Sequence, residues 1–256
     1  MFNSCDVFEI LGYKNTLCFI IVWKMINNQI MIFNKKLKSL NIDGILETVP
    51  SFKSLLVYYD PMKLFFHEVE EIVSDLFGEI DITNKRNKKI IEIPVCYDEE
   101  FGEDLDFVIK HTNLSKEEVI SLHSSQEYLI YMLGFLPGFA YLGGMDERLV
   151  TPRLTNPRLK LEAGAVGIGG KQTGIYPLTS PGGWRIIGRT PIKPYDLDRE
   201  NPILYEAGDY IKFKPISKKE YYEIKDLVEK GIYKCRVIEN ESISQIMEVS
   251  TLEGSA

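Results

Sequence analysis

Apolar residues recur with two different periods in the first 95 residues. They fall three and four positions apart in residues 28–40 and 61–76, which predicts two amphipathic helices, the second capped by Asp60 and started by Pro61. Short apolar and β-branched runs at residues 16–23, 44–49, 54–59 and 89–95 predict four strands. The resulting order, β-α-β-β-α-β, is that of a ferredoxin-like (split βαβ) domain, so we expect this α+β fold for residues 1–95.

The pattern changes after residue 95. Residues 102–111 and 115–123 predict two short helices, and Ser115 with Glu118 three positions later fits a capping box. Between residues 127 and 215, short apolar runs are interrupted by Gly or Pro every several residues, which favours a closed or nearly closed β-barrel. A helix at 218–230 and a strand at 232–238 complete a second domain at residues 96–238, and we expect residues 239–256 to form a mobile tail.

Composition narrows the class of protein. The 256 residues are 45% apolar and 26% charged, the proportions of an ordinary soluble globular protein. The net charge of −7, without a long basic block, argues against nucleic acid as a partner. The segment 131–191 differs from the rest, because it holds 12 of the 19 glycines and seven Lys or Arg against three acids. A glycine-rich, cationic segment of this kind favours an anionic ligand.

Several site classes and compartments are disfavoured. The four cysteines are scattered without metal or redox spacing, and the three histidines lie far apart, so we expect no metal site. The longest apolar run near the start, residues 17–23, is too short to span a bilayer. Acidic residues stand where a secretory signal would be basic. We therefore expect a cytoplasmic protein with no membrane partner.

Candidate binding residues gather in the glycine-rich segment. Side chains able to bind an anion or a polar substrate are Arg153, Arg158, Lys171, Gln172, Thr173 and Arg185. Residues able to form a pocket wall are Phe135, Pro137, Tyr141, Tyr176 and Trp184. The alternatives are that the polar groups line a barrel rim in water and that residues 134–139 only turn a barrel corner. His123 is a candidate for proton transfer or anion binding, or else it complements the C-terminus of its helix.

The same residues resemble a known family, the 5-oxoprolinase B subunits, formerly labelled allophanate hydrolase subunit 1. This family includes the sporulation-kinase inhibitor KipI and is related to subdomains C and D of the carboxyltransferase domain of urea carboxylase. The resemblance runs from about Gly12 to Ile216. The matching blocks are residues 49–61, 93–98, 119–123, 131–144, 152–153, 157–158, 164–177 and 180–191. One departure is Ala165, where members of the family usually have serine.

The resemblance implies a fold and an activity. It implies a cyclophilin-like β-barrel for the second domain and a chain that is inactive alone. With A and C partner subunits, such a chain would open 5-oxo-L-proline to L-glutamate with hydrolysis of ATP, with Mg²⁺ in the assembled complex and no cofactor held tightly by this chain. Phosphorylation of the lactam oxygen would make the ring carbon electrophilic, and guanidinium groups would neutralise the carboxylate and phosphate.

Two other functions stay open at this point. The chain could instead inhibit a sensor histidine kinase, with residues 133–141 forming the contact surface. A urea- or allophanate-related hydrolase or carboxyltransferase activity would follow from the more distant kinship.

Overall fold

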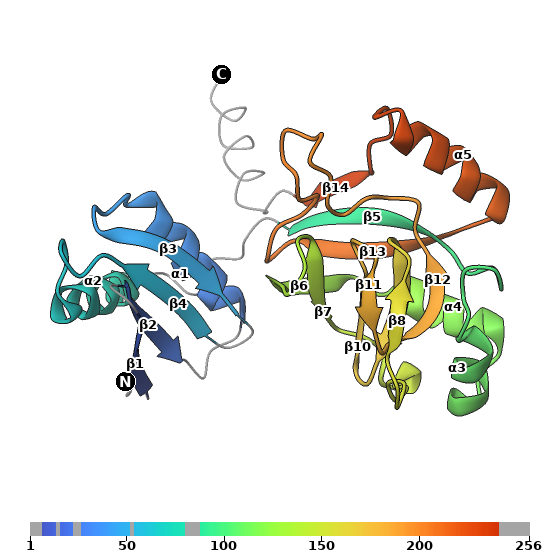
Figure 1. Ribbon diagram of the computed structural model, residues 1–256, viewed down its shortest axis with the longest axis horizontal. Coiled ribbons are helices and arrows are strands. Elements are labelled where there is room, and N and C mark those ends of the chain that lie inside the picture. The colour runs from blue at the N-terminus through green and yellow to red at the C-terminus, as the bar shows by residue number, and fades with distance from the viewer. Residues whose placement is uncertain (1–6, 14–15, 23–26, 52–53, 80–87, 241–256) are drawn as a thin grey trace, which may run out of the picture. The chain divides into compact units, whose positions relative to one another are not determined.

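The computed structural model describes residues 7–13, 16–22, 27–51, 54–79 and 88–240. The chain divides into two compact units, Met1–Arg86 and Asn87–Ala256, each with its own sheet (Figure 1). Both units mix helices with sheets, so the expected α+β class is confirmed. Of the tail predicted at residues 239–256, all but the first two residues lie outside the described part of the chain.

The smaller unit contains a four-stranded antiparallel sheet. Its strands are β1 (Val7–Tyr13), β2 (Thr16–Val22), β3 (Ile45–Pro50) and β4 (Ser54–Tyr59). They lie in the order β1-β2-β4-β3. Helix α1 (Asn27–Ser39) connects β2 to β3, and β4 lies between these two strands. This arrangement is the split βαβ motif expected from the sequence.

Two helices pack on the sheet of the smaller unit. Apolar residues of α1 and α2 (Phe66–Glu79) form one buried cluster with alternate residues of β4, Leu55, Val57 and Tyr59. Helix α2 begins later than the predicted position of Pro61. The Asp60 carboxylate accepts a hydrogen bond from the Met62 amide at 2.9 Å, and residues 61–63 form a turn. The helix instead starts after Phe65, whose amide donates to Glu68.

The last strand of the predicted ferredoxin-like domain is in the other unit. Strand β5 (Lys88–Cys96) pairs in parallel with β13 (Tyr210–Ile216), from Ile90–Tyr210 to Cys96–Ile216. The fourth place in the small sheet is occupied by β1, which the sequence analysis did not predict. The β-α-β-β-α-β assignment for residues 1–95 is therefore wrong at this strand, because β5 finds its partners far along the chain.

The larger unit is organised around a curved eight-stranded sheet in the order β10-β9-β12-β5-β13-β6-β7, with β14 also paired to β5 (Figure 1). Besides β5 and β13, its strands are β6 (Tyr128–Gly134), β7 (Phe139–Gly143), β9 (Ala165–Gly169), β10 (Gln172–Ile175), β12 (Arg185–Arg189) and β14 (Val237–Asn240). In the described residues no hydrogen-bonded ladder joins β10 to β7, so of the closed or nearly closed barrel that we expected, the closed form is wrong. The two end strands still approach each other, since a Cβ on Gly174 would lie 3.2 Å from the Ala140 carbonyl oxygen.

Helices and a small second sheet complete the larger unit. The helices are α3 (Leu105–Thr112), α4 (Lys116–Ser125), α5 (Lys218–Glu229) and the 3-10 helix η1 (Glu147–Leu149). Strands β8 (Arg158–Leu161) and β11 (Ser180–Gly182) pair separately. The expected capping box is present at α4: Ser115 Oγ accepts from the Glu118 amide, and Glu118 accepts from the Ser115 amide. Helices α3 and α4 and seven strands of the large sheet contribute to one buried core.

Candidate ligand-binding site

A pocket of about 240 Å³ opens on the larger unit, and five predicted site residues line it. Four of them are the aromatic residues Phe135, Tyr141, Tyr176 and Trp184, and the fifth is Arg153. Pro137 does not line the pocket. The remaining lining residues, which the sequence analysis did not single out, are Phe139, Leu154, Pro157, Pro181, Gly182 and Gly183.

The aromatic rings of the pocket pack against one another. Phe139 makes edge-on contacts with Tyr141, Tyr176 and Trp184, at centroid separations between 5.2 and 5.6 Å. Burial raises the pKa of the Tyr176 hydroxyl, so this residue presents a neutral phenol. The exposed Arg153 guanidinium lies 5.7 Å from the Trp184 ring centroid and is the only cation among the lining residues. The pocket is therefore a box of aromatic rings, here called the aromatic box, with one positive charge among its lining residues.

Glycines of the segment 131–191 provide space for these rings. A Cβ on Gly169 would overlap the Trp184 indole, and one on Gly174 would lie 3.0 Å from it. A Cβ on Gly182 would lie 2.5 Å from the Tyr176 hydroxyl oxygen. At these three positions the glycines therefore serve the packing of Trp184 and Tyr176, whereas the glycine-rich composition favoured an anionic ligand in the sequence analysis.

Two predicted anion-binding residues are held by a carboxylate that the sequence analysis missed. Arg158 donates to both oxygens of Asp104, at 2.9 and 3.0 Å. The Arg185 guanidinium also contacts Asp104, at 3.4 Å, and lies 3.6 Å from the ring centroid of Phe107. The hydrogen bonds from Arg158 to Asp104 raise the pKa of the Arg158 guanidinium. Neither arginine lines the pocket.

His123 lies in the core, with an exposed fraction of 0%. Its Nδ1 lies 2.7 Å from the Tyr97 hydroxyl and its Nε2 lies 2.8 Å from Thr173 Oγ1. Because Thr173 donates to the Gly167 carbonyl, it accepts from Nε2–H, and Nδ1 accepts from Tyr97. Burial lowers the pKa of His123 to about 3, so the imidazole is neutral. The structure therefore places both His123 and Thr173 in the core, and neither lines the pocket.

The remaining predicted residues lie at the turn between β9 and β10. Lys171 is exposed and Gln172 is half-buried at the first position of β10. Neither lines the aromatic pocket. The structure thus brings together Arg153 and four of the five predicted wall residues, and it separates them from Lys171, Gln172 and the buried Thr173.

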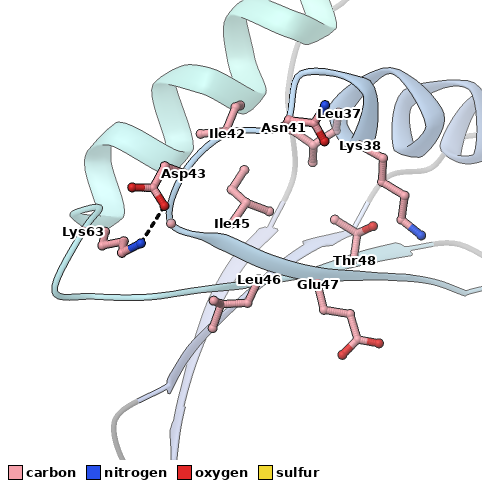
Figure 2. Close-up of a pocket in the computed structure, with 11 residues that line it drawn as sticks. Leu37, Lys38, Asn41, Ile42, Asp43, Ile45, Leu46, Glu47, Thr48 and Lys63 are labelled. Atoms are coloured by element: carbon pink, nitrogen blue, oxygen red, sulfur yellow. Dashed lines mark hydrogen bonds and ion pairs between the residues drawn. The ribbon is translucent and has the colours of Figure 1, made fainter.

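The smaller unit has a second pocket, of about 540 Å³, between the end of α1 and β3 (Figure 2). Lys63 and Asp43 form an ion pair of 2.6 Å on one side, and Lys38 and Thr48 lie on the other (Figure 2). Thr48 is buried, and its hydroxyl has no hydrogen-bond partner among the residues that the structure describes. None of the predicted site residues lies here.

The described residues contain neither a membrane-spanning helix nor a metal cluster. Across residues 7–240, apart from the gaps stated above, no helix has the length and apolar character needed to cross a membrane. In the same part of the chain, no group of three or more His, Cys, Asp or Glu side chains is arranged to hold a metal ion.

Several known proteins are similar to this chain in sequence and in fold. The family described as "Carboxyltransferase domain, subdomain C and D" matches residues 10–205. The 5-oxoprolinase B subunit of Bacillus subtilis (strain 168) is 45% identical over 193 residues, covering 72% of this chain and 80% of the relative. The corresponding protein of Escherichia coli O157:H7 is 42% identical over 176 residues, covering 68% and 80%. The chain belongs to the family of 5-oxoprolinase B subunits.

Members and relatives of this 5-oxoprolinase family also occur within longer chains. The crystal structure of TTHA0988 matches with a TM-score of 0.70 and 34% identity, covering 79% of this chain. This chain spans only 40% of the TTHA0988 chain. The urea amidolyase of Saccharomyces cerevisiae is 26% identical over 227 residues, which cover 76% of this chain and 12% of that protein. The carboxyltransferase-like part is therefore found both as a separate chain and as a segment of larger proteins.

Proposed function

We propose that this chain is the B subunit of an ATP-dependent 5-oxoprolinase and that the aromatic pocket binds 5-oxo-L-proline. The observation that carries the proposal is the 45% identity to the B. subtilis protein together with a pocket of matching chemistry. The reaction consumes the lactam, ATP and water and yields glutamate, ADP and phosphate. In the smaller unit, no predicted site residue lines the second pocket, so we assign the substrate to the larger unit.

The chemistry of the pocket suits a small cyclic carboxylate. The lactam ring is a flat five-membered ring, which can pack against the exposed ring of Phe135 and the half-buried ring of Tyr141. Its carboxylate would pair with the Arg153 guanidinium in the fork geometry that arginine offers. A volume of about 240 Å³ is below the range usual for drug-sized ligands and fits a ligand with one ring.

Activation of the lactam needs partners. We propose that ATP is a substrate of the assembled complex with homologous C and A subunits, with Mg²⁺ accompanying the nucleotide. Phosphoryl transfer to the lactam oxygen breaks the bond to the γ-phosphorus of ATP and releases ADP. Water then adds to the ring carbon, the C–N bond breaks to open the ring, and a second water releases phosphate to give glutamate. We assign none of the described residues to the nucleotide. The role of this chain would be to bind and orient the lactam.

The larger unit resembles a barrel that is not closed by hydrogen bonds. We propose that this open sheet corresponds to the cyclophilin-like domain of the family, with β10 and β7 as its unpaired ends. The close approach of Gly174 to Ala140 supports this relation. We also propose a cytoplasmic location, where 5-oxoproline and ATP are both available.

Reconstitution tests the proposal. The chain would be combined with A and C subunits of the same organism, and release of glutamate and ADP would be followed with 5-oxo-L-proline and with 2-pyrrolidinone, which lacks the carboxylate. We expect ADP and glutamate in equal amounts from 5-oxoproline and a rate at least about tenfold lower with 2-pyrrolidinone, because Arg153 has no carboxylate to bind. Absence of glutamate from the complete complex would contradict the proposed function.

A further inference from the structure

Asp104 is a buried carboxylate that touches three different parts of the larger unit. It precedes α3 and is 5% exposed. Its backbone amide donates to the Ile186 carbonyl at 2.8 Å, and the Ile186 amide donates to Asp104 Oδ2 at 2.8 Å. The same carboxylate accepts from Arg158 and Arg185. Asp104 therefore joins the start of α3 to β12 and to β8.

The two arginines hold opposite ends of one short segment. Arg158 is the last residue of the segment 152–158 and makes the bidentate pair with Asp104. At the other end, Arg185 Nε donates to the Pro152 carbonyl at 3.4 Å while its Nη1 contacts Asp104. Both ends of the segment are thus connected to one carboxylate.

The segment 152–158 supplies a wall of the ligand pocket. Arg153, Leu154 and Pro157 all line the pocket. The Leu154 amide also donates to the Gly183 carbonyl at 2.7 Å, next to Trp184. Residues 152–157 lie in coil and bends between the Thr151–Gly170 bridge and β8, which starts at Arg158 and pairs with β11. Between these two backbone pairings, the segment is held by the polar contacts of Leu154, Arg158 and Arg185.

We propose that Asp104 is the positioning residue of the pocket: through Arg158 and Arg185 it holds the segment 152–158, and with it the Arg153 guanidinium, over the aromatic box. Asp104 does not line the pocket. Its carboxylate reaches the pocket wall through the two arginines and also accepts from the Ile186 amide of β12. Removing its charge takes the shared acceptor from two neighbouring guanidiniums and leaves Arg158 paired only with the exposed Glu103, at 3.3 Å, so both ends of the segment are loosened together. The identity of the ligand rests on the proposed function, but the positioning role does not.

A local spectroscopic signal tests the positioning role without activity. The chain has two tryptophans, so Trp23→Phe leaves Trp184 as the sole fluorescent indole. In this background we would measure acrylamide quenching of Trp184 for Asp104→Asn and for the control Asp106→Asn, an exposed residue of α3. We expect the quenching constant to rise about twofold for Asp104→Asn and to stay unchanged for the control, because only Asp104 holds the wall beside the indole.

Kinetics in the reconstituted complex separate positioning from direct binding. We expect Asp104→Asn and Arg158→Gln each to raise KM for 5-oxoproline about tenfold with kcat changed less than about threefold, and the double variant to be no worse than the worse single variant. If the two increases in KM multiply, Arg158 binds the ligand itself and the proposal is overturned.

Three further results keep the two proposals distinguishable. Unchanged Trp184 quenching in Asp104→Asn would overturn the positioning role whatever the activity. If Asp104→Asn does not fold, Arg185→Lys, which keeps the charge but loses the two-sided reach to Pro152, is expected to raise quenching and KM in the same way, and no change would overturn the proposal. If the wild-type complex does not act on 5-oxoproline, the proposed function fails, while the quenching experiment still decides the role of Asp104.

Discussion

His123 Nε2 donates a hydrogen bond to Thr173 Oγ1 over 2.8 Å, inside a core that water does not reach. This hydrogen bond connects α4 to β10, and the Thr173 hydroxyl in turn donates a hydrogen bond to the Gly167 carbonyl of β9. The imidazole also stacks on Phe213, with ring centroids 4.5 Å apart. The histidine that seemed suited to catalysis therefore stabilises the strands on which the indole of Trp184 rests.

Acid should destabilise the protein through His123. Its pKa is about 3 in the folded chain against an ordinary 6.5, so the unfolded chain binds the extra proton as the pH falls below about 6.5. The stability contribution is complete above that pH and is lost progressively down to about pH 3. At pH 5 the loss amounts to about 2 kcal/mol.

Urea unfolding at pH 7 and pH 5 measures this loss. The variant His123→Gln lacks the titrating ring, so the difference in its free energy of unfolding between the two pH values should be smaller than in the wild type by about 2 kcal/mol. His111→Gln, an exposed histidine of α3, serves as the matched control and should behave as the wild type. An identical pH dependence in His123→Gln and the wild type would contradict the assignment.

Gly169→Ala should displace the Trp184 indole. The new methyl group would occupy the space of the ring, at a cost of about 1–3 kcal/mol in the free energy of unfolding. Gly183→Ala is the control, because its Cβ would have no neighbour closer than 3.5 Å. Thermal unfolding and the fluorescence maximum of Trp184 should change in the first variant only. Equal stability of the two variants would show that the packing of the Trp184 indole does not require a glycine at position 169.

Replacing Arg153 should weaken the binding of 5-oxoproline more than replacing Lys171. We expect Arg153→Gln to raise KM for 5-oxoproline about tenfold or more in the reconstituted complex, since the carboxylate loses its cation. Lys171→Gln removes an equal charge from the exposed β9–β10 turn and should change KM less than about twofold. Steady-state kinetics of both variants give the comparison. A larger effect of Lys171→Gln would move the anion site to the turn.

The caps of two helices can be tested by single substitutions. Ser115 and Ser217 both accept from the amide three residues later, at 3.2 Å, in capping boxes at α4 and α5. Each change to alanine should lower the free energy of unfolding by about 1 kcal/mol. Ser124→Ala, near the other end of α4, is a suitable control because its hydroxyl only contacts a carbonyl within its own helix. Chemical unfolding curves give the free energy of unfolding of each variant. Values for the Ser115 and Ser217 variants equal to that of Ser124→Ala would contradict the prediction.

Local features were predictable from the sequence and distant pairings were not. The α4 cap follows from the Ser115–Glu118 spacing alone, and β4 begins and ends at the predicted residues. The aromatic wall stays a prediction, although four of its five residues, all but Pro137, line one pocket of the segment 131–191. The partner of β5 was not predictable, since an apolar run indicates a strand without indicating which strand lies beside it.

The separation of the two predicted arginines from the pocket was not predictable for the same reason, because it depends on a contact between residues that are distant in the chain. Arg158 and Arg185 looked free because their shared acceptor, Asp104, lies 54 and 81 positions away in the chain. An acidic residue just before an apolar helical stripe is a recognisable signal for the start of a helix, and it could have marked Asp104 as a cap. Nothing in the sequence shows that its carboxylate would bind two arginines.

The pairing of β5 sets an order of events during synthesis. Ile90 leaves the ribosome long before Tyr210, the residue it pairs with, has been translated. The sheet of the smaller unit has all its strands by residue 59, whereas β5 must wait, unpaired, for nearly the whole second unit. Such a delayed long-range pairing slows folding and leaves a hydrophobic strand available to other chains. Nascent chains that stop before residue 210 therefore carry an open sheet edge, and this makes chaperone capture most needed late in translation.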